Sequence, residues 1–263
     1  MGIEVKGLSY AYERGKPVLR ELSFPVDRGS FVCLLGPNGV GKSTLFKCML
    51  GLLPCGRGHI FIDGADMADF TPRRLSRKLA YIPQSTAPVF NYSVADAVLM
   101  GTTARTALFS SPGQRERACA EKAMELLGIR QLAGRPYANI SGGERQLVLI
   151  ARALAQQADY LFMDEPTANL DYGNQIKVLE RVRALTREGY TVIQSTHSPE
   201  QAFLYADSVV AVKDGRIAAL GAPNAVMDSA LLSSLYSAEV SVESLRGGTV
   251  RVCVPGAALK GRR

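Results

Sequence analysis

The stretch GPNGVGKST, from Gly36 to Thr44, decides the fold. It matches the pattern G-x-x-x-x-G-K-[S/T]. It follows SFVCLLG, an apolar run typical of a buried strand, and it leads into STLFKCMLGLL, whose apolar residues recur at helical spacing up to Pro54. Glycines in this position let backbone N–H groups wrap around phosphates, and a lysine adds a positive charge. The sequence therefore predicts a strand, a phosphate-binding loop and a helix, in that order.

Within this loop, Lys42 is expected to approach the β- and γ-phosphates of a nucleotide, Ser43 to offer its hydroxyl to Mg²⁺, and Thr44 to donate to the α-phosphate. The alternative is a helix N-terminus with glycines present only for packing. We disfavour it because the strand, the spacing, the lysine and the hydroxyl are all in place. The residues predicted to bind the nucleotide here are Gly36, Pro37, Asn38, Gly39, Val40, Gly41, Lys42, Ser43 and Thr44.

A second motif is YLFMDEP, which runs from Tyr160 to Pro166. In it, an apolar run is followed by two adjacent carboxylates. Asp164, at the end of a buried strand, suits a partner of Mg²⁺ that acts through a water molecule. Glu165 is the candidate to orient or deprotonate an attacking water. A solvated acidic turn is the alternative, but it does not explain why the pair follows an entirely apolar run.

A second phosphate-binding element is NISGGERQ, from Asn139 to Gln146, about a hundred residues further along the chain. Ser141 is a good N-cap, the two glycines permit close backbone approach, and a helix N-terminus attracts anions. Two phosphate-binding elements in one chain call for an explanation.

Strand and helix patterns alternate on both sides of a helical block at 92–157, which predicts a mainly parallel sheet with a helical insertion. The sequence around Asp214 and Gly215 is typical of a hairpin turn. The last forty residues are compatible with a short helix and a strand pair. The predicted strands are 2–12, 18–26, 30–36, 58–64, 159–166 and 190–197, and the predicted helices include 93–101, 114–129, 143–157 and 174–189.

Bulk properties exclude several classes of protein. No run approaches the ~20 apolar residues that cross a bilayer, and the N-terminus lacks the apolar region of a secretion signal. The five scattered cysteines fit reduced thiols in the cytosol. The net charge of +7 comes from residues spread along the chain, so we expect no nucleic-acid partner. We expect the protein to stay in the cytoplasm.

Taken in order, these motifs resemble those of the ATP-binding subunit of an ABC transporter, over roughly residues 3 to 225. GPNGVGKST resembles the Walker A loop, Gln84 in YIPQ the Q-loop, and ISGGERQ the signature motif. YLFMDE resembles Walker B, Asp171 in ANLD the D-loop aspartate, and His197 in QSTHS the switch histidine. The signature departs from the commonest family form, LSGGQ, but it keeps Ser141, Gly142 and Gly143.

The resemblance implies an α/β fold of the P-loop NTPase class, with ATP and Mg²⁺ as cofactors. Its parts would be a RecA-like core with a mainly parallel sheet, an N-terminal antiparallel β-subdomain and an α-helical signature subdomain. The ABC ATP-binding domain would span residues 1–225, with the core at 1–90 and 155–225 and the helical subdomain at about 91–154. Residues 226–263 would form a C-terminal extension of unknown role.

The resemblance also implies roles for single residues. Tyr12 would stack on adenine, with Tyr10 on the same strand face as its competitor. Gln84 would contact Mg²⁺ or the attacking water, and His197 would hold the γ-phosphate and Glu165 in line. The nucleotide-contacting set would further include Ser141, Gly142, Gly143 and Asp171.

Partners follow from the same resemblance. The signature motif would face ATP held by a second copy of the chain, so that two copies form a head-to-tail homodimer. Integral membrane permease subunits would dock onto it, a substrate-binding protein would act indirectly, and the protein would lie peripherally on the cytoplasmic face of the inner membrane. Val89, Phe90, Tyr92, Val94, Val98, Leu99 and Met100 would supply apolar contacts to a permease helix or belong to the helical core.

For the cargo, DMADFTPRRLSRKLAYIPQ and SVADAVLMGTTART resemble importer subunits that serve iron–siderophore, haem and cobalamin uptake. Gly101-Thr102-Thr103-Ala104-Arg105 departs from those relatives, so molybdate or another oxyanion stays open. The alternative function is a soluble ABC ATPase of DNA repair, translation or cluster assembly. We disfavour it because the chain leaves no room for a long coiled coil and carries one cassette.

Overall fold

The computed structural model describes residues 2–13, 15–84, 92–105, 111–248 and 250–259. The chain forms two compact units. The first comprises Met1–Asp69 with Ile193–Arg263, and the second comprises Phe70–Val192. Each unit is described by itself. The partition into a core and a helical subdomain that the sequence suggested remains a prediction.

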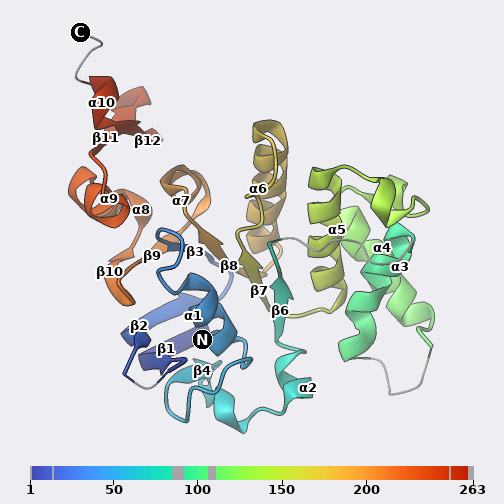
Figure 1. Ribbon diagram of the computed structural model, residues 1–263. Helices are drawn as coiled ribbons and strands as arrows, with labels where there is room; N and C mark the ends of the chain where they lie inside the picture. Colours follow the sequence, from blue (N-terminus) through green and yellow to red (C-terminus); the bar gives the residue numbers. More distant parts are fainter. Residues whose placement is uncertain (1, 14, 85–91, 106–110, 249, 260–263) are drawn as a thin grey trace. The chain divides into compact units, whose positions relative to one another are not determined.

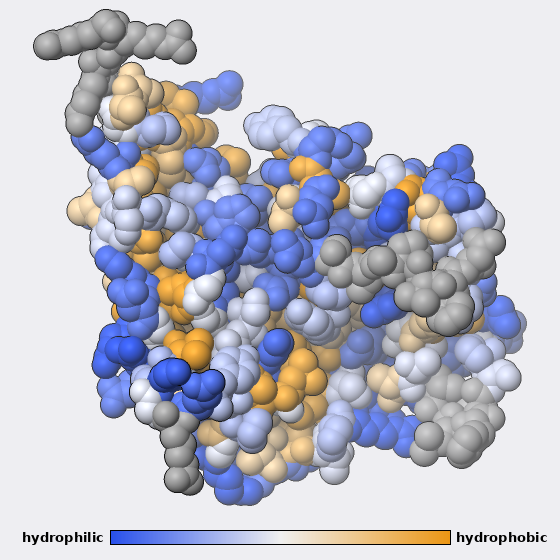
Figure 2. All heavy atoms as spheres, in the orientation of Figure 1, coloured by the Kyte–Doolittle hydropathy of each residue, from blue (hydrophilic) through white to orange (hydrophobic). Residues whose placement is uncertain are grey.

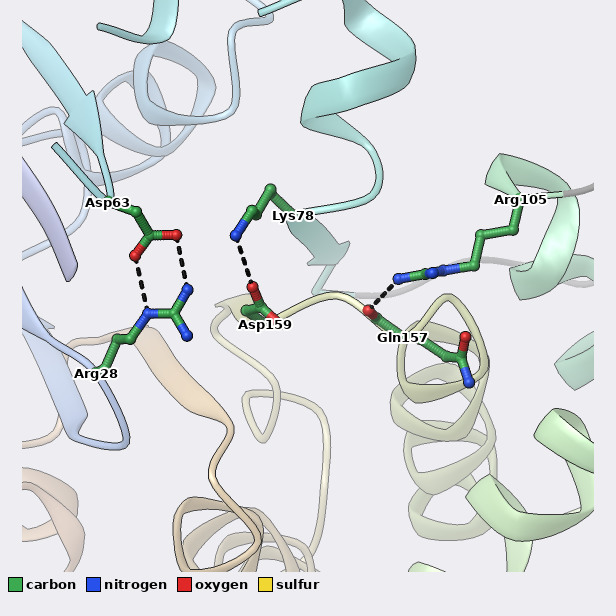
Figure 3. A network of polar contacts seen from close by, with 6 residues as sticks. All are labelled: Arg28, Asp63, Lys78, Arg105, Gln157 and Asp159. Atoms are coloured by element: carbon green, nitrogen blue, oxygen red, sulfur yellow. Dashed lines mark hydrogen bonds and ion pairs between the residues drawn. The ribbon is translucent and has the colours of Figure 1, made fainter. Parts of the chain in front are cut away.

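The first unit opens with an antiparallel sheet (Figure 1). Its strands are β1 (Gly2–Ala11), β2 (Pro17–Asp27), β4 (Ile60–Ile62) and β5 (Ala65–Asp66), in the order β2-β1-β4-β5. Ile3 and Val5 of β1 are buried while their neighbour Glu4 is exposed, the alternation expected of a sheet with one covered face. A bidentate ion pair joins Arg28 to Asp63, with N–O distances of 2.8 and 2.7 Å (Figure 3). The predicted N-terminal β-subdomain is confirmed.

A second group of strands in this unit contains the strand before the phosphate loop. β3 (Phe31–Leu35) is buried over its whole length and pairs in parallel with β9 (Ser208–Lys213). The order is β10-β9-β3-β8, with β10 (Arg216–Gly221) and β8 (Thr191–Thr196), which enters this unit at Ile193. β9 and β10 form the predicted hairpin, with positive φ at Asp214 and Gly215. An entirely apolar strand is typical of a sheet covered on both faces.

Helix α1 (Lys42–Met49) follows the phosphate loop but ends earlier than the sequence predicted. The apolar pattern continues to Leu53, yet Gly51 adopts a φ of 71° and the N–H of Leu52 donates to the carbonyl of Lys47 at 2.8 Å. This is a glycine-terminated helix end, in which a left-handed residue closes the last turn. The prediction that the helix reaches Pro54 is therefore wrong.

The C-terminal part of the first unit adds small elements. α7 (Pro199–Tyr205) follows β8, and α8 (Pro223–Val226) and α9 (Ser229–Tyr236) follow the hairpin. β11 (Val240–Leu245) pairs with β12 (Val250–Pro255), and β12 packs against α7. The remaining short elements are η1 (Met67–Asp69), η5 (Arg246–Gly248) and α10 (Gly256–Leu259). The predicted helix and strand pair are confirmed.

In the second unit, β6 (Leu79–Ile82) and β7 (Tyr160–Asp164) pair in parallel. Lys78, just before β6, forms a 3.0 Å ion pair with Asp159, just before β7 (Figure 3). α2 (Pro72–Leu75) precedes β6, and α6 (Tyr172–Arg187) follows β7.

The rest of the second unit is the predicted helical block. It contains α3 (Val94–Leu99), η2 (Met100–Ala104), α4 (Gln114–Leu126), η3 (Arg130–Leu132), η4 (Tyr137–Asn139) and α5 (Gly142–Ala155). η2 lies against α5 so closely that a Cβ on Gly101 would be 1.9 Å from the carbonyl oxygen of Arg152. Arg105 then donates to the carbonyls of Gln156 and Gln157 at the end of α5 (Figure 3).

On the face shown in Figure 2, hydrophobic residues gather in small clusters among hydrophilic ones. No helix among the described residues is both long and apolar enough to cross a bilayer. Of the apolar set around residue 95, Val94 and Val98 belong to the helical core, whereas Tyr92 and Met100 are exposed. Val89 and Phe90 lie outside the described residues.

Candidate functional site

The phosphate loop joins the end of β3 to the start of α1. Gly36 donates from its N–H to the carbonyl of Thr196 at 3.3 Å, which ties the loop to β8. Gly39 and Gly41 have φ values of 82° and 107°, in the left-handed region that favours glycine. Gly41 is the N-cap residue of α1, and no side chain caps the helix there. The first N–H groups of α1 are therefore oriented to bind an anion.

The lack of space for a Cβ atom also requires glycine at positions 36 and 41. A Cβ on Gly36 would lie 2.5 Å from the carbonyl oxygen of Val212, and one on Gly41 would lie 2.9 Å from the side chain of Leu19. Any larger residue would push the loop away from the strands that support it.

The side chains of α1 divide between binding and packing. Lys42 is 5% exposed, and its ammonium donates to the carbonyls of Gly36 and Pro37 at 2.7 and 3.0 Å. Ser43 is exposed, so its hydroxyl is accessible, while Thr44 is buried. An exposed hydroxyl suits Mg²⁺, which keeps most of its waters and takes few protein oxygens. The residues present at the loop fit a nucleotide–magnesium complex.

Tyr12, just after the end of β1, lies beside the phosphate loop, and Tyr10 of β1 packs against it. The hydroxyl of Tyr12 is 3.3 Å from Oγ1 of Thr44, and 57% of the Tyr12 side chain is exposed. Tyr10 packs edge-to-face against Tyr12, with ring centroids 5.2 Å apart and planes at 84°. An exposed ring braced by a second ring is suited to stacking. This geometry favours Tyr12 over Tyr10 as the partner of adenine, in line with the preference from the sequence.

His197 follows the last residue of β8 and is exposed. Its backbone carbonyl accepts a hydrogen bond from the hydroxyl of Tyr236 at 2.9 Å. On either side, the N–H of Ser198 donates to Oγ1 of Thr196 at 3.1 Å, and that hydroxyl is 3.0 Å from Oε1 of Gln201. The histidine thus lies at the surface on a backbone segment held at several points.

In the second unit, β7 presents the paired carboxylates. Four buried residues lead to Asp164, which is half-buried, and Glu165 then adopts a φ of 44°. A left-handed conformation at a non-glycine residue costs free energy and is often associated with functional sites.

Tyr81 of β6 is a neighbour of Asp164 that the sequence did not reveal. Its hydroxyl donates to Oδ2 of Asp164 at 3.4 Å. Burial, followed by the negative charge of Asp164, raises the pKa of Tyr81 to about 12. The phenol therefore stays protonated and can donate to the carboxylate near neutral pH.

The signature segment begins α5, as predicted. Oγ of Ser141 accepts from the N–H of Glu144 at 3.3 Å, and the carboxylate of Glu144 accepts from the N–H of Ser141 at 2.8 Å. This is a complete capping box. The N–H and hydroxyl of Ser141 hold the pKa of Glu144 below its usual range. Ser141 and Gly142 are exposed, so this helix start is accessible to a ligand.

Gly143 and Asp171 belong to one junction between helices. A Cβ on Gly143 would lie 2.7 Å from Cγ of Asn174, so only glycine fits beside this side chain. Asp171 is the N-cap of α6 and accepts from the N–H and amide of Asn174 at 2.9 and 2.6 Å. These donors, the N–H first, hold the pKa of Asp171 below its usual range. The signature motif is therefore packed directly against the D-loop cap.

Gln84 is exposed and borders a cavity of about 220 Å³ in the second unit. Three buried polar atoms on the cavity's lining residues, Tyr137 Oη, Arg145 Nε and Gln146 Nε2, have no hydrogen-bond partner among the described residues. The other residues around this cavity are Gly142, Leu149, Pro166, Asn169 and Leu170.

The predicted site residues thus form two sets, one in each unit. The first unit brings together Tyr12, the phosphate loop and His197. The second carries Gln84, the signature segment, the paired carboxylates and Asp171. Within the described residues, no three His, Cys, Asp or Glu side chains gather as a preformed metal site.

The chain is similar to known proteins in both sequence and structure. A family model described as "ABC transporter" matches residues 19–168. An uncharacterised ABC transporter ATP-binding protein of Haemophilus influenzae is 43% identical over 210 residues, 80% of each chain. A cobalamin import ATP-binding protein of Halobacterium salinarum is 37% identical over 243 residues, which cover 92% of this chain and 60% of that relative.

Among solved structures, a metal-chelate type ABC transporter in an inward-facing conformation aligns with a TM-score of 0.85 and 29% identity. The alignment covers 97% of this chain and 96% of that one.

Proposed function

Because this chain belongs to the ABC transporter family of ATP-hydrolysing subunits, we propose that it powers an importer of a metal chelate. The observation that carries the proposal is the phosphate loop, with its uncapped helix start and buried lysine ahead of an exposed serine. We further propose that individual residues of the candidate site perform separate steps of ATP binding and hydrolysis.

Nucleotide binding falls to the first unit. The adenine stacks on Tyr12, and the phosphates bind the N–H groups between Gly36 and Thr44. Lys42 neutralises charge on the β- and γ-phosphates, exchanging loop carbonyls for phosphate oxygens. Thr44, whose hydroxyl lies near that of Tyr12, donates to the α-phosphate.

Hydrolysis requires groups that position a water molecule and neutralise developing charge. Ser43, Asp164 and Gln84 are the proposed ligands of Mg²⁺, directly or through water, and the ion when bound shields the phosphate oxygens. Glu165 orients and deprotonates the attacking water, and His197 holds the γ-phosphate. The exposure of Ser43, Gln84 and His197 supports these roles, because each side chain is accessible to a nucleotide.

The signature segment acts on a second copy of the chain in this proposal. Ser141, Gly142 and Gly143 bind the γ-phosphate of ATP held by the partner's phosphate loop, with Asp171 beside them. The exposed, capped start of α5 supports this role. A head-to-tail homodimer that closes on ATP and opens after hydrolysis uses both phosphate-binding elements.

Membrane coupling completes the proposal. Permease subunits bind the dimer on the cytoplasmic face of the membrane, and a substrate-binding protein delivers cargo to them. The exposed side chains of Tyr92 and Met100 are candidate contacts. The cargo is an iron or other metal chelate such as a siderophore, haem or cobalamin, with an oxyanion such as molybdate as the competing class. The cobalamin-importing relative and the metal-chelate transporter support the chelate.

The test separates binding from hydrolysis. Glu165→Gln should retain binding of a fluorescent ATP analogue but lose turnover by about a hundredfold or more, the usual contribution of a general base. Lys42→Ala should weaken binding itself. Glu180→Gln, an exposed change on α6, is the matched control and should keep full activity. Near-normal turnover in Glu165→Gln would remove its assigned role.

A second experiment addresses the partners. The protein purified with its associated membrane subunits should carry a metal chelate on the binding protein, identifiable by mass spectrometry. Recovery of DNA or ribosomes in place of membrane protein would overturn the transporter assignment.

A further inference from the structure

The C-terminal segment after residue 226 has no assigned role, yet it contacts the backbone of the switch histidine. Tyr236 is the last residue of α9, and its hydroxyl donates to the carbonyl of His197 at 2.9 Å. Tyr236 is half-buried, and this burial, together with the charge of Glu200, raises the pKa of its phenol. The hydroxyl is therefore a constant donor across the physiological pH range.

A second contact from the same segment reaches the start of α7. Cys253, on β12, lies next to the carboxylate of Glu200 on α7, where β12 packs against that helix. The same carboxylate accepts from the hydroxyl of Ser198 at 3.1 Å. Burial and Glu200 raise the pKa of Cys253 to about 12, so the thiol keeps its proton. The segment 197–200 is thus held at both ends by residues from beyond position 226.

Tyr236 is itself held in place by hydrogen bonds at both ends of α9. Asp228 caps α9 by accepting from the N–H of Leu231 at 2.7 Å. After α9, Ser237 is left-handed, with a φ of 52°, and Ser233 bonds both the N–H and the carbonyl of Val240. These bonds lock the turn from α9 into β11, so the ring of Tyr236 has a defined position.

We propose that Tyr236 is a positioning residue for hydrolysis, acting through the backbone of His197, with Cys253 as its support at Glu200. The inference rests on the role proposed above for His197. A carbonyl anchored by a phenol fixes the peptide from which the imidazole extends, so the imidazole points consistently at the γ-phosphate. Within the described part of the chain, neither residue has a hydrogen bond to the phosphate loop, so we expect nucleotide affinity not to depend on them.

The experiment measures steady-state ATP hydrolysis by the full chain with Tyr236→Phe, which removes one hydroxyl and keeps the ring. We expect kcat to fall about three- to tenfold, the loss that one neutral hydrogen bond accounts for, with KM unchanged and the denaturant midpoint close to that of the wild type. Tyr190→Phe, at another half-buried tyrosine, is the matched control and should change neither parameter. An unchanged kcat in Tyr236→Phe overturns the proposal.

A double-mutant cycle with His197→Ala distinguishes positioning from a general structural effect. If Tyr236 acts through the imidazole, Tyr236→Phe adds no further loss in the His197→Ala background. The same fractional loss in both backgrounds overturns the proposal. A fully active His197→Ala protein instead removes the proposed role of the histidine, which distinguishes failure of the premise from failure of the inference.

Two further measurements do not rely on the activity of the His197→Ala protein. Hydrogen exchange of the backbone amides of His197, Ser198 and Glu200 should be faster in Tyr236→Phe than in Tyr190→Phe, and equal rates overturn the inference. Cys253→Ser, which keeps a donor, should retain most of the wild-type kcat, whereas Cys253→Ala should lower it. Equal loss in both Cys253 variants argues against a hydrogen bond between Cys253 and Glu200.

Discussion

Tyr81 and Asp164, which are 83 positions apart, meet at the carboxyl ends of the neighbouring strands β6 and β7, where the phenol donates to the carboxylate at 3.4 Å. Parallel strands bring their carboxyl ends to the same edge of a sheet, which is where ligands bind in α/β proteins. Asp164, the carboxylate that we propose as a partner of Mg²⁺, therefore has a neutral hydrogen-bond donor beside it. A neutral donor adds no positive charge that would repel the ion.

Tyr81→Phe should have a small effect. The 3.4 Å bond is long for a hydroxyl donor, so its loss should cost about 0.5 kcal/mol, roughly a twofold change. We expect the Mg²⁺ concentration for half-maximal ATP hydrolysis to shift by no more than about threefold. Asp164→Asn, measured alongside, should abolish most activity. A Tyr81→Phe loss as large as that of Asp164→Asn would show that the phenol has a direct role.

Gly101→Ala should destabilise the helical block severely. Its Cβ would overlap the carbonyl of Arg152, so η2 must move away from α5. Overpacking of this kind costs about 1–3 kcal/mol or more. Gly134→Ala is the matched control, since its Cβ would meet no atom within 4 Å and should change the free energy of unfolding by less than about 0.5 kcal/mol. Urea denaturation measures both, and equal midpoints would contradict the prediction.

Thiol reactivity should differ sharply between cysteines. The thiols of Cys48 and Cys55 are hydrogen-bonded, which lowers the pKa of Cys55 and raises that of Cys48, while burial raises the pKa of Cys33 to about 12. Because the thiolate is the reactive form, a disulfide reagent at neutral pH should modify Cys55 first and leave Cys33 unmodified until the protein unfolds.

Mass spectrometry of peptides after short exposure to the reagent identifies the modified residue. Cys55→Ser should remove the fast phase and Cys33→Ser should leave it intact. Early modification of Cys33 would contradict the burial that the fold assigns to β3.

Ser141→Arg tests the two roles of this serine. As the N-cap of α5, its loss should cost about 1 kcal/mol of stability. As the proposed clamp on the partner's ATP, its replacement by arginine should also abolish dimer formation and hydrolysis, while the monomer still binds ATP. Size-exclusion chromatography with ATP and a non-hydrolysing Glu165→Gln background measures the dimer.

Ser93→Arg provides the control, because Ser93 caps α3 through the same kind of capping box. It should lose similar stability yet still dimerise. If both variants dimerise equally, the signature serine has only a structural role.

Local patterns predicted most of the fold and most of the backbone features of the candidate site. The strand, glycine loop and helix around Gly36, the capping box at Ser141 and the hairpin at Asp214 all depend on residues within a few positions of one another. Helix α1 is the exception, because the apolar spacing of Leu50 to Leu53 matches a helix while the φ of Gly51 ends it. The helical spacing of apolar residues does not reveal that a glycine within the apolar run ends the helix.

Contacts between distant positions escaped prediction for a different reason. The sequence assigned no role to Tyr81, Gly101 or Tyr236, and each gains its role from a residue far along the chain. Which strand edge or turn a tyrosine meets depends on how the elements pack. Along β6, Leu79, Ala80 and Ile82 are buried and Tyr81 is exposed, a pattern that the sequence LAYI does not reveal.

The ammonium of Lys42 is already bound to two carbonyls of its own loop. In the role proposed for Lys42, phosphate oxygens must therefore displace these carbonyls to reach the ammonium. The free energy gained on nucleotide binding is then smaller than an ammonium without such partners would provide. The carbonyls bind the lysine again when the phosphates leave. An ATPase that powers transport has to release the product nucleotide in every cycle. Competition between the carbonyls and the phosphates for Lys42 favours this release.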